Sequence, residues 1–275
     1  MVTDMTHTGP DTSLPRSACR PINRCNVPPV ILGSLTFQRH PEPVHIDGVA
    51  TFHADLFVLL DKLTDATARA EQFQDYMAVQ FRLKNPEDAG GQKGHGRAKA
   101  DYLRTLRGWF FDSDGREGAV LKSWAESRFG LLPRHHNGVL GTSEDAGFLL
   151  DRAAGLHNTN ALEAQLDLVF AYCQYELARR FVRETHITLY RGVNRLNHFD
   201  IIEDRGPHDQ ALLFNNVNSF TTNRDMAGAF GDHILTVRVP RSKVVFFSGL
   251  LPGRMQGEDE YIVLGGVYDV TSTTY

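Results

Sequence analysis

Hydrophobic patterning divides the chain into two parts of different character. Large apolar residues recur every three or four positions over residues 49–81, which predicts one long amphipathic helix or a kinked pair. The same period predicts helices near 98–111, 117–129 and 159–183, and a weaker one after 143. After Thr185, short β-rich runs predict strands at 186–191, 199–202, 211–221, 234–239, 244–247, 261–264 and 267–271, with one short helix near 225–230.

Helices followed by strands, rather than alternating with them, predict an α+β fold. The first 45 residues contain seven prolines, which predicts an extended leader with one short strand near 30–37. We therefore expect a leader over 1–45 and a single domain over 46–275. Within that domain, 46–185 would be helical and 186–275 would be β-rich.

Composition and charge exclude several classes of function. A hydrophobic content of 41% supports a substantial core, and a net charge of −4 gives no general attraction to nucleic acid. No apolar run is long enough to span a membrane. The chain has three cysteines and no apolar signal segment, which predicts unpaired thiols in a cytoplasmic protein. Cys19 and Cys25 fit no zinc spacing, so we expect no metal.

One acidic stretch stands directly before an apolar run. Glu258, Asp259 and Glu260 precede the predicted strand 261–264. Because side chains alternate along a strand, Glu258 and Glu260 share a face, about 7 Å apart along the chain. Two carboxylates so close are costly unless one is protonated or a cation lies beside them. The alternative is a solvated acidic turn before an edge strand.

Two further stretches carry candidate chemistry. Arg191 and Gly192 end one predicted strand, and Ser219-Phe220-Thr221-Thr222 precedes the short helix. Each is weak alone, since a Ser/Thr cluster before a helix is usually an N-cap. In this order, and followed by the Glu-x-Glu stretch, they resemble the Arg–Ser–Glu type of mono-ADP-ribosyltransferases. That family has an arginine on the first core strand, a Ser-x-Ser/Thr strand, and a Glu-x-Glu before an apolar strand.

The resemblance implies a core of two small, mostly antiparallel sheets enclosing an NAD cleft, with the helical part packed on it. It assigns NAD as the substrate and implies that Arg191 binds its phosphates through a planar charged fork. Gly192 would offer backbone to the nicotinamide amide. We also include Phe220 and Thr221 among the candidate NAD-binding residues. Phe220 or Phe214 would stack on nicotinamide, and packing in the core is the alternative role for either ring.

The two glutamates receive different roles. Glu260 would stabilise the oxocarbenium character that develops as nicotinamide leaves, and Ser219 would hold Glu260 by a hydrogen bond. Glu258 would orient and deprotonate an acceptor arginine, since Glu-x-Glu is associated with arginine acceptors. Because Phe220 interrupts the Ser/Thr run, a register with Thr222 in the serine role stays open.

Over its whole length the chain resembles the branch of this family found in nitrogen-fixing bacteria. That resemblance implies an arginine of dinitrogenase reductase, the nitrogenase iron protein, as acceptor, reversible inactivation of nitrogenase, and control by a PII-type nitrogen-signalling protein. Two alternatives stay open. The same fold would act on another acceptor or on water, or it would be a non-enzymatic module that binds a partner.

Overall fold

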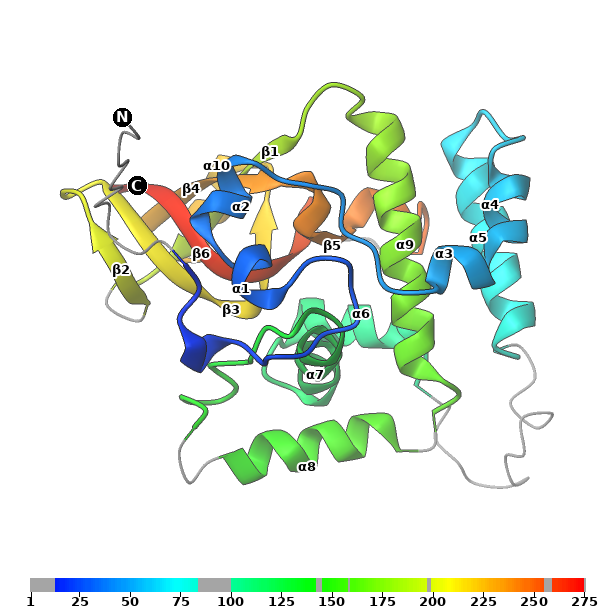
Figure 1. Cartoon of the computed structure of the whole chain (residues 1–275), viewed down its shortest axis with the longest axis horizontal. Coiled ribbons are helices and arrows are strands. Elements are labelled where there is room, and N and C mark those ends of the chain that lie inside the picture. The colour runs from blue at the N-terminus through cyan, green and yellow to red at the C-terminus, as the bar shows by residue number, and fades with distance from the viewer. Residues whose placement is uncertain are drawn as a thin grey trace, which may run out of the picture.

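The computed structural model describes residues 13–83, 100–141, 145–157, 159–196, 199–254 and 259–274. The class is α+β, as predicted: helices come first and an antiparallel sheet follows (Figure 1). The helices are α1 (Pro29–Leu32), α2 (Leu35–Arg39), α3 (Val49–Phe52), α4 (Ala54–Leu60), α5 (Ala66–Gln80), α6 (Tyr102–Phe111), α7 (Arg116–Phe129), α8 (Asp145–Leu156), α9 (Leu162–Arg180) and α10 (Arg224–Gly228). The strands are β1 (His186–Val193), β2 (Asp200–Asp204), β3 (Asp209–Thr221), β4 (His233–Pro240), β5 (Val244–Phe247) and β6 (Glu260–Thr274).

The prediction of a strand near 30–37 is wrong. Two short helices occupy this region, because Pro29 starts α1 where no backbone N–H is needed and Ser34 caps α2. The Ser34 hydroxyl accepts the Phe37 N–H at 3.1 Å. From Leu14 onward, apolar side chains of this segment lie in the core, and the Gly33 carbonyl accepts the Val267 N–H of β6 at 2.8 Å. The division of the chain into domains stays a prediction.

Residues 49–81 are helical as predicted, but they form three helices rather than one long helix or a kinked pair. The chain leaves helical geometry at His53 and again after Asp61, and the Asp65 side chain caps α5 by accepting the Ala68 N–H at 2.8 Å. The segment therefore folds as α3, α4 and α5. In Figure 1, α4 and α5 lie on the side of α9 remote from the sheet.

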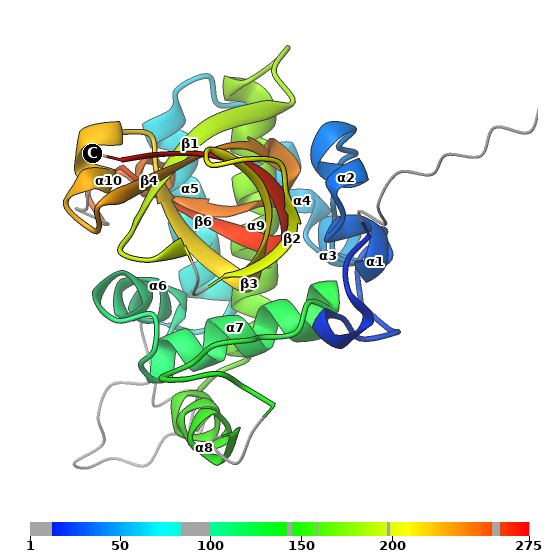
Figure 2. The ribbon, with the colours of Figure 1, turned by 90° about the vertical axis from the view of Figure 1, so that its left-hand side faces the viewer.

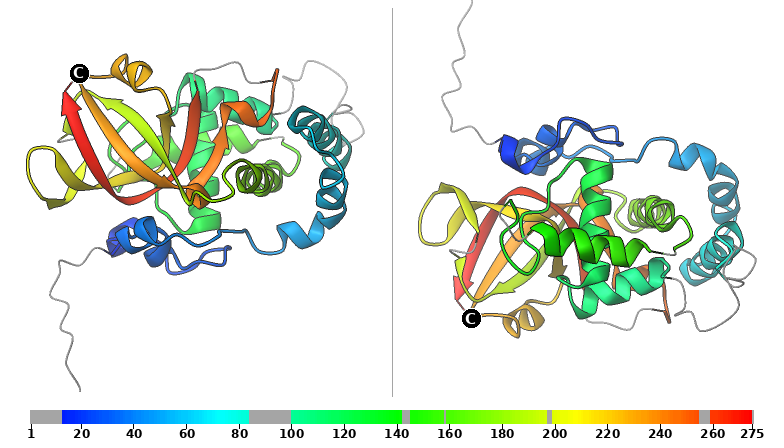
Figure 3. Two further views of the ribbon diagram at one scale, coloured as in Figure 1. Left: turned by 90° about the horizontal axis from the view of Figure 1, so that it is seen from above. Right: turned by 90° about the horizontal axis from the view of Figure 1, so that it is seen from below.

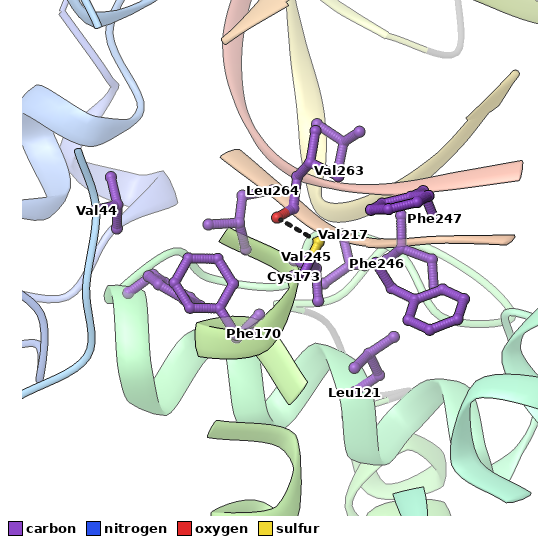
Figure 4. Close-up of a cluster of buried hydrophobic side chains, with 14 of the residues drawn as sticks. Val44, Leu121, Phe170, Cys173, Val217, Val245, Phe246, Phe247, Val263 and Leu264 are labelled. Atoms are coloured by element: carbon purple, nitrogen blue, oxygen red, sulfur yellow. Dashed lines mark hydrogen bonds between the residues drawn. The ribbon is translucent and has the colours of Figure 1, made fainter. Parts of the chain in front are cut away.

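Helix α9 is the central element between these helices and the sheet. Its predicted apolar stripe is buried from Leu162 to Leu177, and Phe181 after its end is half-buried. Figure 4 shows Phe170 and Cys173 of α9 in one buried cluster with Val245, Phe246 and Phe247 of β5. The Cys173 thiol donates to the Val244 carbonyl at 3.7 Å. All three cysteines are unpaired, as predicted. A buried ion pair, Arg69–Glu176 at 2.6 Å, joins α9 to α5.

The strands form one hydrogen-bonded sheet in the order β2-β3-β1-β4-β6-β5, rather than two separate ones. An additional β3–β6 pairing closes β1, β3, β6 and β4 into a small ring. Figure 2 shows this curled sheet with α7 and α8 below it, and Figure 3 shows the same layers from above and below. No helix in the described ranges is long and apolar enough to cross a membrane.

The two strands expected at 261–264 and 267–271 are one continuous strand, β6. Glycine at 265 and 266 does not interrupt it, because β3 has an irregularity between Phe214 and Val217 that lies against this point. A Cβ on Gly265 would lie 1.6 Å from the Asn215 carbonyl oxygen, so only glycine fits there. The glycines therefore mark a close approach of two backbones and not a turn.

The core contains one lysine whose ammonium has no hydrogen-bond partner among the described residues. Lys243 follows β4 and is fully buried, with Nζ 4.2 Å from the ring centroid of Tyr268. Burial lowers the pKa of Lys243 to about 7. In the unfolded chain a lysine has a pKa of about 10.4, so the unfolded state holds this proton more tightly.

The free energy of unfolding should therefore fall as the pH is lowered through the interval between the unfolded-state and folded-state pKa values of Lys243. Between pH 9 and pH 7, we expect Lys243 to reduce the free energy of unfolding by about 2 kcal/mol. Lys243→Met should remove that contribution, measured by urea unfolding at both pH values. Lys62→Met, on an exposed lysine, is the matched control. Equal pH dependence in wild type and Lys243→Met would contradict the assignment.

Candidate active site

The candidate site is built where β1 and β3 separate. Strand β1 pairs with β4 along its whole length, but meets β3 only at Tyr190–Thr221. Arg191 is the next residue after this single pair, and its Nη1 donates to the Ser219 carbonyl oxygen at 2.7 Å. The side chain of Arg191 therefore bridges the gap between the two strands and lies beside the predicted serine.

The guanidinium of Arg191 is deeply buried, although the residue keeps some exposed surface. Its Nε is a buried donor with no hydrogen-bond partner in the described part of the chain. Burial lowers the pKa of Arg191, and the charge of Glu260 opposes that effect. A buried guanidinium is costly unless anions lie close to it. Glu260 supplies one such anion, and the unpartnered Nε is placed for a further acceptor.

Ser219 contacts the helical part of the chain through its side chain. The indole Nε1 of Trp109, on α6, donates to Ser219 Oγ at 2.9 Å. Trp109 is 3% exposed and Ser219 is half-buried, so this bond is partly shielded from water. The sequence predicted a helix around Trp109, but nothing in its spacing indicated contact with Ser219. An indole on the buried face of an amphipathic helix, which needs an acceptor, was the signal available.

Glu260 begins β6 and is half-buried. It lies opposite Thr221 in the β3–β6 register, and Ser219 lies opposite Ile262. Directly opposed residues of antiparallel strands project from the same face, so Thr221 and Glu260 are side by side. The Thr221 hydroxyl accepts the Asn223 N–H at 3.1 Å, which fixes the turn into α10.

Two other predicted site residues have clear packing roles. The ring of Phe220 is buried, 5.7 Å from the ring of Phe214, so its contact with NAD stays a prediction. A Cβ on Gly192 would lie 1.8 Å from the Ala227 carbonyl oxygen of α10, so glycine is required for this close approach. Thr222 is exposed beyond the end of β3. Ser219 Oγ accepts from Trp109, and the choice between Ser219 and Thr222 stays a prediction.

Glu258 lies outside the described residues, and its role stays a prediction. The loop before it is tied to the helices: Arg107 Nη2 of α6 donates to the Arg254 carbonyl at 3.1 Å. The Arg254 side chain in turn donates to Gln74 Oε1 of α5 at 2.7 Å. The helical part thus holds the chain just before the acidic stretch.

Metal and cavity geometry add two observations. Within the described ranges, no cluster of three or more His, Cys, Asp or Glu residues is arranged to hold a metal. One cavity of about 470 Å³ lies on α6, between Arg107, Phe111 and Glu117. A second, of about 480 Å³, lies between residues 41–50 and α9. Neither is lined by Arg191, Ser219 or Glu260, so the NAD cleft expected from the resemblance stays a prediction.

Comparisons with known proteins identify the class of protein, which is an ADP-ribosyltransferase. A family model described as dinitrogenase reductase ADP-ribosyltransferase (DRAT) matches residues 22–272. A curated protein of Rhodospirillum rubrum, NAD(+)–dinitrogen-reductase ADP-D-ribosyltransferase, is 37% identical over 260 residues, covering 91% of this chain and 94% of the relative. The chain belongs to the dinitrogenase reductase ADP-ribosyltransferase family. No solved structure matches it.

Proposed function

We propose that this protein transfers ADP-ribose from NAD to an arginine of dinitrogenase reductase and releases nicotinamide. The observation that carries the proposal is the 37% identity, over 91% of the chain, to a relative named for this reaction. The modified iron protein would no longer support nitrogenase, and removal of the group would restore it. The reaction is a glycosyl transfer, in which the bond from ribose to nicotinamide breaks and a bond from ribose to arginine forms.

Arg191 would hold the pyrophosphate of NAD. Its Nη1 is fixed by the Ser219 carbonyl, and its buried Nε has no partner in the described part of the chain. Phosphate oxygens are suitable acceptors for such a donor, because charged hydrogen bonds to phosphate are short and strong. Binding an anion here would also compensate the cost of burying the guanidinium.

Glu260 would act on the ribose. As nicotinamide leaves, positive charge develops at the anomeric carbon and ring oxygen, and a fixed carboxylate stabilises that charge more than it stabilises NAD itself. The Ser219 hydroxyl accepts from Trp109 and retains its own proton to donate. Donation to Glu260 would fix the carboxylate, a supporting role that helps to preorganise the site.

Glu258 would serve the acceptor. A protonated guanidinium is a poor nucleophile, so a nearby carboxylate must orient it and take a proton as nitrogen attacks. Glu258→Gln should therefore lower transfer to arginine by about 100-fold while sparing slow hydrolysis of NAD, since water needs no such base. Nicotinamide release measured with and without acceptor tests this. Loss of hydrolysis to the same extent would mean that the two glutamates act as one unit.

Control by a PII-type protein belongs to the same proposal and rests on the resemblance to the nitrogen-fixation branch of the family. A cytoplasmic location belongs to it too, and rests on the cysteine content and the lack of an apolar signal segment. Binding of a purified PII-type protein should change the transfer rate. An unchanged rate over a full titration would remove the regulator from the proposal and leave the chemistry intact.

The proposal is tested by incubating the purified chain with radiolabelled NAD and dinitrogenase reductase. Label on the acceptor in a one-to-one ratio with released nicotinamide supports transfer. Nicotinamide release without labelling would support the hydrolytic alternative. If the chain binds the acceptor but yields neither labelled acceptor nor free nicotinamide, the result would support the non-enzymatic binding module.

A further inference from the structure

We propose that Trp109 is a positioning residue for the reaction: its indole N–H sets the direction of the Ser219 hydroxyl and so couples the helical part to the catalytic carboxylate. This inference rests on the proposed function. In this role Trp109 acts on the reaction through Ser219.

Ser219 is held at two points by different parts of the chain. Its carbonyl oxygen accepts Arg191 Nη1 at 2.7 Å, and its Oγ accepts Trp109 Nε1 at 2.9 Å. One residue of β3 therefore contacts both the proposed phosphate-binding arginine and a buried side chain of α6.

The chemistry of an indole makes this contact directional. Trp Nε1–H can only donate, whereas a serine hydroxyl both donates and accepts. Ser219 must therefore accept from Trp109, which leaves its single proton directed elsewhere. A hydroxyl without such a partner samples three staggered positions. The N–H of Trp109 thus selects the orientation in which Ser219 donates away from α6.

Trp109 is buried beside a lysine that is itself hydrogen-bonded. The ammonium of Lys122, on α7, lies 6.0 Å from the centroid of the Trp109 ring. Lys122 is 1% exposed and donates to Asp114 Oδ1 at 2.5 Å and to the His135 carbonyl at 2.9 Å. A rigid support of this kind is what a positioning residue requires, because a loosely held donor cannot fix its acceptor.

The start of α6 is also fixed to the central helix. The Tyr102 backbone N–H donates to Gln165 Oε1 of α9 at 3.0 Å, and the Asp101 side chain caps α6 by accepting the Arg104 N–H at 2.8 Å. Helices α6, α7 and α9 thereby form one frame around Trp109. This gives the helical part a role in the reaction that goes beyond covering the sheet.

A purely structural role is the alternative, since a buried indole N–H generally requires an acceptor. The chain has two tryptophans, which provides a matched control. Trp124 is also fully buried, and its Nε1 donates to Asp167 Oδ1 at 2.6 Å, far along the chain from any predicted site residue. Loss of either N–H removes the one hydrogen bond of a buried indole, but only the Trp109 bond is to Ser219.

The experiment compares Trp109→Phe and Trp124→Phe in nicotinamide release with and without dinitrogenase reductase. Trp109→Phe should lower kcat about tenfold in both assays, with the KM for NAD changed less than twofold. Trp124→Phe should lower the thermal unfolding midpoint. At assay temperatures below that midpoint, its kcat should equal that of wild type. In a Ser219→Ala background, Trp109→Phe should lower kcat less than twofold, because the group it orients is already absent.

If Trp109→Phe does not fold, an analogue of tryptophan with nearly the same shape can be used instead. In Trp124→Phe, Trp109 is the single tryptophan, and biosynthetic replacement by β-(3-benzothienyl)alanine removes its N–H with little change in shape. The same tenfold loss of kcat is expected. Full kcat in the replaced protein, or an equal loss in the Ser219→Ala background, would overturn the positioning role. A wild-type chain with neither transfer nor hydrolysis would instead overturn the proposed function, and this inference with it.

Discussion

Glu260→Gln should lower both ADP-ribose transfer and NAD hydrolysis by about 10²–10³-fold or more, the usual effect of removing a preorganised electrostatic contact to the transition state. Both reactions pass through the same positive charge on the ribose, so both should be lost together. NAD affinity should change little, because the contact is strongest in the transition state. Nicotinamide release and NAD titration, each with the variant and wild type, measure the two effects.

Asp259→Asn is the matched control for that variant. Asp259 is the adjacent carboxylate; it is exposed and lies just before the start of β6. It should keep transfer within about twofold of wild type. If Glu260→Gln keeps more than about a tenth of wild-type hydrolysis, Glu260 does not stabilise the sugar cation, and another group must do so.

Arg191→Ala should weaken NAD binding by about 2–3 kcal/mol, or roughly 30- to 150-fold in Kd, by removing a charged fork from phosphate. Arg191→Lys should recover only part of this loss, since a point charge cannot reproduce the fork. Calorimetric titration with NAD measures both. The control is Arg238→Ala, on the neighbouring strand β4, whose side chain is exposed.

The fold of the Arg191 variants must be checked alongside affinity, because the residue also bonds the Ser219 carbonyl. Unfolding midpoints supply that check. Normal NAD affinity in a folded Arg191→Ala protein would make Arg191 a structural link between β1 and β3 and would remove it from the binding site.

Periodic segments were predictable because one period dominates them. The apolar stripe of α9, from Leu162 to Leu177, repeats at helical spacing and is buried as expected. The strands that carry Glu260 and Thr221 were predicted approximately, but the pairing of these two residues could not be predicted from the sequence. Pairing depends on which strands meet in space, and that is set by the β3–β6 contact that closes the sheet.

Predictions from local patterns were wrong where one residue type is compatible with two different local structures. Pro28 and Pro29 were interpreted as breakers in an extended leader, yet proline is equally suited to the first turn of a helix. The predicted strands 261–264 and 267–271 left out Gly265 and Gly266, yet β6 is continuous there and Gly265 admits the Asn215 backbone. The partner of Ser219 was equally hidden, because Trp109 lies 110 positions away in sequence.

The most direct test of the central claim is the mass and position of the modification on dinitrogenase reductase after incubation with this chain and NAD. We predict one ADP-ribose per modified subunit, located by peptide mass spectrometry on a single arginine, and no modification with Glu260→Gln. Replacing that acceptor arginine by lysine should abolish labelling. Modification on a residue other than arginine, or an unmodified acceptor under conditions where nicotinamide is released, would contradict the account.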